Sequence, residues 1–141
     1  MFSKTNLIST LITALWAFLG GYLLWGILID PYLQGHQGTA TGVWKEAPDF
    51  VVIAIASVIT GWAVSTLYSK WARGVHSLSH GAQFGILVGI IIGFGDRLVE
   101  YGVGNILDLT GTLVNGVIYL VFFGVMSALA GLVYSKLKSE S

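Results

Sequence analysis

The chain has 141 residues, of which 55% are hydrophobic and only 10% are charged, and its formal net charge is zero. A soluble domain usually carries about 25% charged residues, so this composition predicts a protein whose surroundings are mostly lipid. The balanced charge and the lack of a basic stripe argue against a nucleic-acid partner. Because the chain has no cysteine, disulfides, iron–sulfur ligation and thiol redox chemistry are excluded.

The first apolar segment, 5–29, is long enough to cross a membrane, because a spanning helix needs roughly 20 mainly apolar residues. It exceeds the apolar core of about 7–15 residues found in a cleavable signal peptide, so we interpret it as a retained helix. Asp30 and Pro31 follow it. We expect Pro31 to end the helix, because proline lacks a backbone N–H and its ring clashes with the preceding turn.

Three further apolar segments follow, and they cover 50–71, 79–101 and 112–136. Asp49 precedes the second of the four helices. The hydroxyl of Ser79 is expected to cap the third by accepting a free backbone N–H, and Thr110 or Thr112 is expected to start the fourth. The unbroken apolar runs do not alternate as the strands of a membrane β-barrel would. The whole chain, 1–141, is therefore predicted to be one all-α membrane domain with four transmembrane helices.

Basic residues are distributed unevenly over the predicted loops and ends. One side has Lys4, Lys70, Arg73, Lys136 and Lys138, whereas the other has only Lys45 and Arg97. By the positive-inside rule, both termini and the 72–78 loop are expected in the cytoplasm, and the loops 30–49 and 102–111 outside. Aromatic residues are then expected to form an inner belt of Tyr68, Trp71 and Tyr134 and an outer belt of Trp25, Tyr32, Trp44 and Tyr101.

The two halves of the chain share a pattern when one is shifted by 66 residues. Asp30 then falls on Asp96, and each closes an odd-numbered helix. The run Tyr68-Ser69-Lys70 falls on Tyr134-Ser135-Lys136, and each closes an even-numbered helix. These few identities arise either from residues that commonly end membrane helices or from a true duplication. A duplication would give a 2+2 parallel repeat of two hairpins, related by an axis along the membrane normal.

Every predicted helix carries a stripe of small residues at four-residue spacing, which favours close helix packing in lipid. The stripes are Gly81, Gly85, Gly89 and Gly93 in the third helix; Ser57, Gly61, Ser65 and Ser69 in the second; Ser127, Gly131 and Ser135 in the fourth; and Ser9, Thr13, Ala17 and Gly21 in the first. The third stripe, with three overlapping GxxxG motifs, predicts glycine-zipper packing. The stripes serve either one tightly packed bundle or, if one faces outward, an oligomer or pore.

Charged residues occur at the outward end of the third predicted helix. Its uninterrupted apolar part, 81–95, covers only about 22 Å, which is less than the roughly 30 Å of the membrane core. Asp96, Arg97 and Glu100 therefore fall near the membrane boundary, where unpaired charges are costly and often functional. With Asp30 they form either an ion-pair cluster that fixes the depth of the helix or a mouth that binds a cation, a polar headgroup or a partner.

Other candidate residues point to little chemistry. His76 and His80 are four apart and are weak candidates for a metal site, but no third ligand is evident and they also fit solvated loop histidines. No histidine, acid or lysine lies mid-span, which argues against bis-histidine haem and against the usual centre of a proton-coupled carrier. Trp16, Thr60 and Trp62 are expected mid-membrane, where they either pack or line a ligand cavity. We expect no cofactor and no catalytic residue.

Four stretches resemble a family of bacterial inner-membrane proteins of similar length that has no assigned activity. The stretches are GGYLLWGILIDPYL, APDF, HGAQFGILVGIIIGFGDRLVEYGVGN and AGLVYSKLKS. The resemblance covers almost the whole chain. It implies a four-helix topology and a location in the bacterial inner membrane, and it supplies no catalytic residues.

Three functions compete on this basis. The first is a non-enzymatic association or accessory module whose partners are membrane lipids, a second copy of the chain or another membrane protein. The second is a small transporter or channel for a cation or small polar solute, with Asp30, Asp96 and Glu100 at its outer mouth. The third, ranked last, is a lipid-modifying enzyme that uses Asp96 or Glu100 as acid or base. A transporter predicts a polar cavity that reaches mid-membrane, whereas an association module predicts solid packing there.

Overall fold

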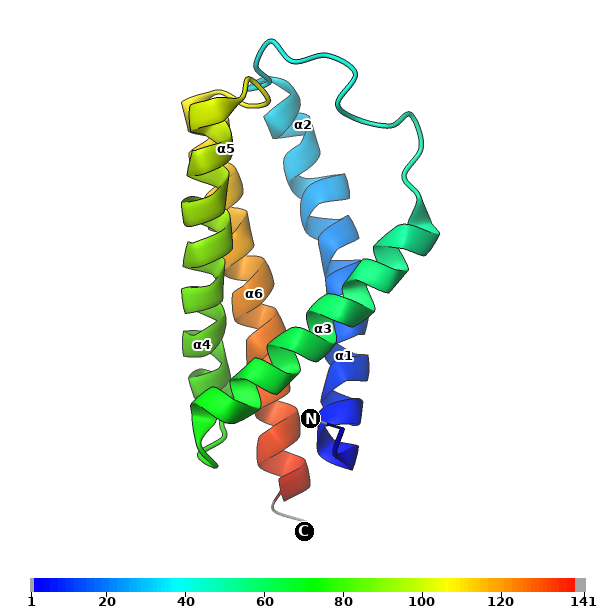
Figure 1. Ribbon diagram of the computed structural model, residues 1–141, viewed down its shortest axis with the longest axis vertical. Coiled ribbons are helices and arrows are strands. Elements are labelled where there is room, and N and C mark those ends of the chain that lie inside the picture. The colour runs from blue at the N-terminus through cyan, green and yellow to red at the C-terminus, as the bar shows by residue number, and fades with distance from the viewer. Residues whose placement is uncertain (1, 139–141) are drawn as a thin grey trace.

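A computed structural model of the chain describes residues 2–138, and of Lys138 the backbone only. Within these residues every regular element is a helix, and one isolated bridge joins Gln37 and Leu107 in the loops. Three of the four helical rods run roughly parallel and the one formed by 50–72 crosses them obliquely, with both ends of the described chain at the same end of the bundle (Figure 1). All four are long and apolar enough to cross a membrane. The predicted fold class is therefore confirmed.

The first rod continues beyond its predicted end. It consists of α1 (Lys4–Gly21), a π-helical segment η1 (Tyr22–Ile29) and α2 (Asp30–Gln34). The expectation that Pro31 ends this helix is wrong. The wide π turns shift the hydrogen-bond register, so that the Asp30 N–H binds the carbonyl of Trp25, five residues back. Pro31 then occupies the start of a new α-helical turn, where a missing N–H is tolerated.

The third rod also contains π-helical turns. It runs through α4 (Leu78–Ile90), η2 (Ile91–Asp96) and α5 (Arg97–Val103) and ends at Gly104. Its cap is Ser77 rather than the predicted Ser79, because the Ser77 hydroxyl accepts the His80 N–H at 2.9 Å. A π-helical segment thus precedes or includes the aspartate in both odd-numbered rods. This is a further similarity between the halves, and their duplication stays a prediction.

The second and fourth rods are the uninterrupted helices α3 (Phe50–Ala72) and α6 (Leu109–Lys138). Asp49 caps α3 by accepting the Val52 N–H at 3.1 Å. Asp108 does the same for α6, accepting the Gly111 N–H at 2.7 Å. The fourth helix therefore begins at Leu109, ahead of the two threonines expected to start it, because an aspartate supplies the cap.

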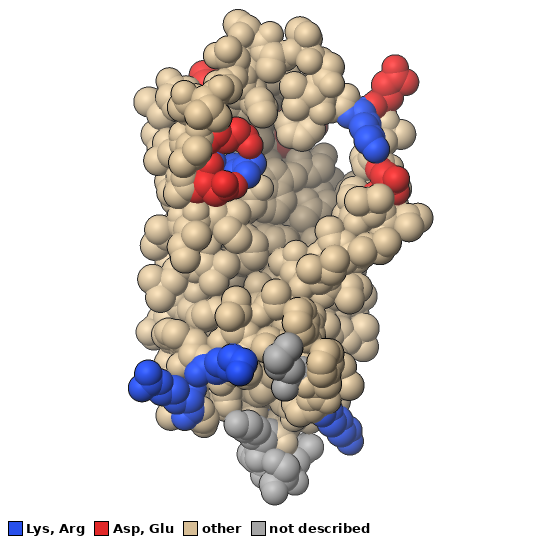
Figure 2. Space-filling model, in the orientation of Figure 1, with Lys and Arg blue, Asp and Glu red and all other residues tan. Residues whose placement is uncertain are grey.

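Charge divides the bundle into two ends. The basic end holds the two ends of the described chain and the turn between α3 and α4, whereas the acidic end holds the loop 35–49 and the turn 104–108 (Figure 1), and Figure 2 shows the charged side chains at each end. The described basic residues there are Lys4, Lys70, Arg73 and Lys136. Lys138 belongs to the same group by sequence, but its side chain lies outside the described residues.

The best-packed part of the core lies toward the basic end. Its fully buried side chains are Ser9, Thr13, Ser65, Tyr68, Met126, Ser127 and Ala130. Tyr68 and Tyr134 were expected in an aromatic belt at the membrane surface, and that expectation is wrong. They are 0% and 3% exposed, and their rings meet edge to face at 5.9 Å between centroids. Small residues on the surrounding helices leave room for both rings inside the bundle.

The glycine stripe of the third rod faces a neighbouring helix of the same chain. A Cβ atom added at Gly81 or Gly85 would overlap the backbone of α6, and one at Gly89 would lie 2.9 Å from the Leu120 Cα. Gly93 meets the Gly116 carbonyl in the same way, at 2.7 Å. The glycine stripe thus lies inside the hairpin of α4 and α6, where the chain itself covers it.

The stripe on α3 packs against α1. A Cβ atom at Gly61 would lie 2.7 Å from the Ala14 backbone nitrogen, and Ser65 is fully buried one turn further on. Gly131 on α6 lies against the Tyr68 hydroxyl, 3.1 Å from the position of an added Cβ. These contacts hold α1, α3 and α6 together in the basic half of the bundle.

Candidate functional site

Arg97 is the centre of the charged cluster at the acidic end. Its Nη1 lies 2.7 Å from a Glu100 carboxylate oxygen, and its Nη2 pairs with Asp96. The side chain of Arg97 is 27% exposed and that of Asp96 is 60% exposed. Two carboxylates therefore share one guanidinium, which leaves the cluster with a net charge of −1.

Asp30 lies apart from this cluster. It accepts a hydrogen bond from the Gln34 amide at 3.3 Å. Among residues 2–138 it forms no ion pair, and it does not meet Asp96, its equivalent in the proposed repeat. The Asp30 side chain is exposed, so its carboxylate is accessible from outside the bundle.

A polar pocket of about 310 Å³ nevertheless brings most of the predicted site together. Asp30, Arg97 and Glu100 line it, whereas Asp96 does not and pairs with Arg97 from outside. Trp25 and Asn115 form part of its wall, with the indole N–H donating to the Asn115 amide oxygen at 2.7 Å. Trp25 is thus turned into the bundle, and its predicted place in the outer belt is wrong.

A larger cavity of about 820 Å³ adjoins this pocket, between the first rod, α3 and α6. Figure 2 shows the surface hollowed below the loop 35–49, between the charged side chains of α5 and those near the start of α3. Its walls are mostly apolar and aromatic. They include Ala17, Phe18, Gly21, Tyr22, Trp25, Gly26, Phe50, Ile53, Ala56, Ser57, Thr60, Tyr119, Phe122 and Phe123.

The direction of α3 creates this cavity. In the basic half α3 is in contact with α1, but it crosses that helix obliquely and its Phe50 end diverges from the bundle (Figure 1). The space opened in this way reaches Thr60, halfway along α3. Trp16, by contrast, packs between helices and donates its indole N–H to the Phe122 carbonyl at 2.9 Å. Of these two expected mid-membrane residues, Thr60 lines a cavity and Trp16 packs.

Asp30 lies where the two cavities meet. Four residues line both of them, namely Trp25, Asp30, Trp44 and Tyr119. Lys45 also lines the larger cavity, and it is exposed. The site as a whole is therefore amphipathic, because a mostly apolar cavity adjoins a smaller pocket that three charged side chains line.

A buried polar network lies in the basic half of the bundle, away from the two cavities. The Asn6 amide nitrogen is within hydrogen-bonding distance of the Ser65 and Thr66 hydroxyls, at 3.3 and 3.2 Å, and of the Tyr134 hydroxyl at 2.9 Å. Asn6 itself is 2% exposed. Sequence reasoning missed this residue, because it lies in the first helical turn and its partners come from two other helices.

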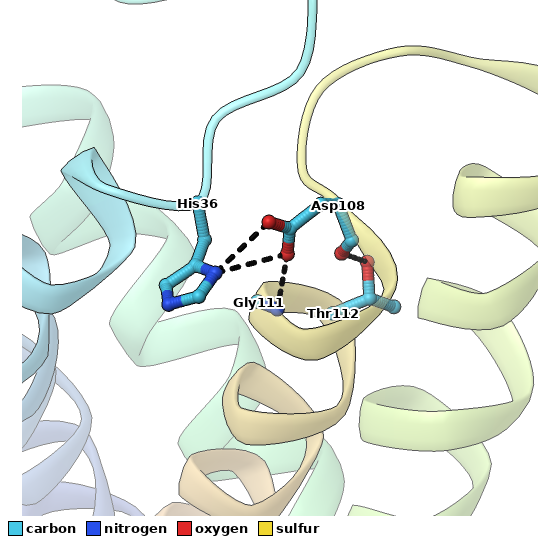
Figure 3. Close-up of polar contacts among 4 residues, drawn as sticks. All are labelled: His36, Asp108, Gly111 and Thr112. Atoms are coloured by element: carbon cyan, nitrogen blue, oxygen red, sulfur yellow. Dashed lines mark hydrogen bonds and ion pairs between the residues drawn. The ribbon is translucent and has the colours of Figure 1, made fainter.

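A clasp between two loops covers the acidic end. The Nδ1 atom of His36 lies 2.9 and 3.2 Å from the two oxygens of Asp108, which also caps α6 through Gly111 (Figure 3). The Gly38 N–H donates to the Ile106 carbonyl at 2.8 Å, and the Asp108 N–H to the His36 carbonyl at 2.7 Å. These bonds fix one end of the loop that carries Trp44 and Lys45 over the cavity.

The clasp was not predicted from the sequence. The position of Asp108 ahead of a helix is a local signal, but its partner His36 lies 72 residues away. Hydrogen bonds from the Gly111 backbone N–H, which has the larger effect, and from the His36 ring favour the ionised carboxylate. They lower the pKa of Asp108 from its ordinary value.

The two histidines at the basic end face different partners. His76 Nδ1 lies 3.4 Å from the Tyr68 hydroxyl, whereas His80 Nδ1 lies 2.7 Å from the Val75 carbonyl. Among residues 2–138, no three His, Cys, Asp or Glu side chains gather as a metal site would require. The pair has therefore no further ligand in the part of the chain that the structure describes.

The fold and the site together define a small multi-pass membrane protein with an amphipathic cavity in one half of its bundle. Comparison of the chain with protein-family models, with curated proteins and with solved structures finds no match.

Proposed function

We propose that this protein is a non-enzymatic membrane module that holds a hydrophobic molecule in the cavity between the first rod, α3 and α6. One observation carries the proposal: the cavity is about 820 Å³, mostly apolar, and confined to the acidic half of the bundle. Its volume falls in the range of about 300–1,000 Å³ that is typical of ligand sites. Its lining of aromatic side chains with a few polar groups is also typical of such sites.

We further propose that the basic end faces the cytoplasm. Lys4, Lys70, Arg73 and Lys136 all lie there, which agrees with the positive-inside rule. The cavity then opens in the outer half of the membrane. A location in the bacterial inner membrane rests on the family resemblance alone.

The alternative is a small transporter for a cation or polar solute. Asp30 and Glu100 in the polar pocket favour it. Against it, apolar rings such as Phe122 line the larger cavity near the middle of α6. A route through the basic half would also have to displace Tyr68 and Met126, which are fully buried. We therefore rank binding above transport, and both above catalysis.

Filling the cavity tests the proposal. Ala56 lines the cavity, whereas Ala54 lies on the same helix and does not. Both are exposed in the protein, so a tryptophan at either position leaves the core untouched. Ala56→Trp is expected to lose co-purifying lipid or other hydrophobic ligand in native mass spectrometry from mild detergent, whereas Ala54→Trp retains it. Equal retention by the two variants, or no ligand on the wild type, would refute the proposal.

A further inference from the structure

We propose that the molecule bound in the larger cavity is a zwitterionic phospholipid. One acyl chain lies in the apolar cavity, and the headgroup lies between Lys45 and Asp30. This inference rests on the proposed function and names the ligand class of the same site. Its basis is a pair of opposite charges at the mouth of one apolar cavity. Lys45 and Asp30 both line that cavity, and neither forms an ion pair among residues 2–138.

Among residues 2–138, no ion pair within 4.0 Å joins the Lys45 ammonium to the Asp30 carboxylate. A zwitterionic headgroup carries a phosphate and an ammonium group on one short chain. The phosphate complements the Lys45 ammonium, and the headgroup ammonium complements the Asp30 carboxylate. Binding therefore supplies a partner to each of two charges that the protein leaves unpaired at the membrane boundary, where unpaired charge is costly.

The polar pocket gives the headgroup space beside Asp30. Glu100 adds a second carboxylate to that pocket, and the charge of Arg97 is already shared between Glu100 and Asp96. Trp44 lines both cavities and is 71% exposed. Indole rings favour the level of lipid headgroups and attract ammonium groups through their faces.

Lipids with a single charge fit less well. An anionic phospholipid satisfies Lys45 but brings no cation to Asp30 or Glu100. A cationic amphiphile satisfies Asp30 but approaches the ammonium of Lys45. Only a headgroup with both charges complements both sides of the mouth, so the site should discriminate by headgroup as well as bind acyl chain.

The test compares phospholipids with identical acyl chains, added to the delipidated full-length protein in mild detergent and counted by native mass spectrometry. Phosphatidylethanolamine and phosphatidylcholine are the zwitterionic probes, and phosphatidylglycerol is the anionic one. Wild type is expected to bind both zwitterionic lipids in preference. Asp30→Asn and Lys45→Gln should each weaken this binding by about three-fold, the size expected for one partly exposed ion pair.

The two variants should also change selectivity in opposite directions. Asp30→Asn leaves Lys45 and should shift preference toward phosphatidylglycerol, whereas Lys45→Gln should shift it toward a cationic amphiphile with the same chain. A misfolded variant would lose all lipids together. Glu46→Gln and Lys70→Gln are matched controls, because neither residue lines a cavity, and both should behave as wild type.

The outcomes separate the two proposals. If lipid binds and Ala56→Trp abolishes it, but all headgroups bind equally or the charge variants match their controls, the cavity assignment stands and the headgroup assignment fails. A preference of the wild type for phosphatidylglycerol or for the cationic amphiphile also overturns the headgroup assignment. If Ala56→Trp has no effect on bound lipid, the cavity assignment fails.

Discussion

The contact between α4 and α6 can be tested by adding one methyl group at Gly85. A Cβ atom there would overlap the Phe123 carbonyl oxygen, and it would lie 2.6 Å from the carbonyl carbon and 2.8 Å from the Gly124 Cα. Carbon atoms pack best at about 3.5–4.0 Å, so Gly85→Ala must push the two helices apart locally by about 1 Å. Overpacking of this kind typically costs about 1–3 kcal/mol.

The matched control is Gly102→Ala in the same rod, because an added Cβ at Gly102 meets no atom within 4 Å. Replacing glycine by alanine gains at most about 1 kcal/mol of helix propensity at either position, so the overpacking at Gly85 should still decide the comparison. Gly85→Ala should therefore be about 1–3 kcal/mol less stable than Gly102→Ala. The assay is reversible unfolding in mixed micelles, in which the denaturing detergent is titrated and helicity or Trp fluorescence is followed. Equal stability of the two variants would refute the packing geometry described for the glycine stripe.

Two further predictions concern the ends of the bundle. At the acidic end, the lowered pKa of Asp108 means that the clasp is stable above the ordinary carboxyl pKa and is lost only as pH falls through the lowered value. A spin label can be attached at Thr41→Cys alone, because the chain has no cysteine. The label should stay immobile from neutral to mildly acidic pH and become mobile in strong acid. A label that becomes mobile already at mildly acidic pH would contradict the lowered pKa of Asp108. At the basic end, Asn6→Leu should lower the free energy of unfolding by about 1–2 kcal/mol, since it removes hydrogen bonds between helices and leaves the buried Tyr134 hydroxyl without its Asn6 donor. The same micelle titration measures this loss, and a fully stable Asn6→Leu protein would show that the network contributes nothing.

The spans could be predicted from the sequence because lipid imposes a simple length rule on apolar helices. Their ends were less predictable. Pro31 is a strong local stop signal, yet π turns before it carry the helix on to Gln34. Tyr68 and Tyr134 have the composition of a membrane belt, but small residues on facing helices let them turn inward. Both errors arise where tertiary packing overrides a local preference.

The candidate site was only partly predictable for the same reason. Glu100 lies three residues after Arg97, so their contact follows from helix geometry. The cavity depends on the oblique crossing of α3, which no local pattern of residues encodes. The clasp between His36 and Asp108 joins two loops that are far apart in sequence. Residues such as Thr60 gain their place in the site only from the arrangement of the helices.

The central claim, that the cavity holds acyl chain, is tested most directly by photo-crosslinking. The protein is reconstituted with phosphatidylethanolamine that carries a diazirine near the end of one acyl chain, irradiated, and mapped by peptide sequencing. Phe122 and Phe123 line the cavity and are 8% and 4% exposed, whereas Val117 and Val121 on the same helix are 50% and 43% exposed. The account predicts adducts on Phe122 or Phe123 that disappear in Ala56→Trp. Adducts confined to Val117, Val121 and other exposed positions would contradict it.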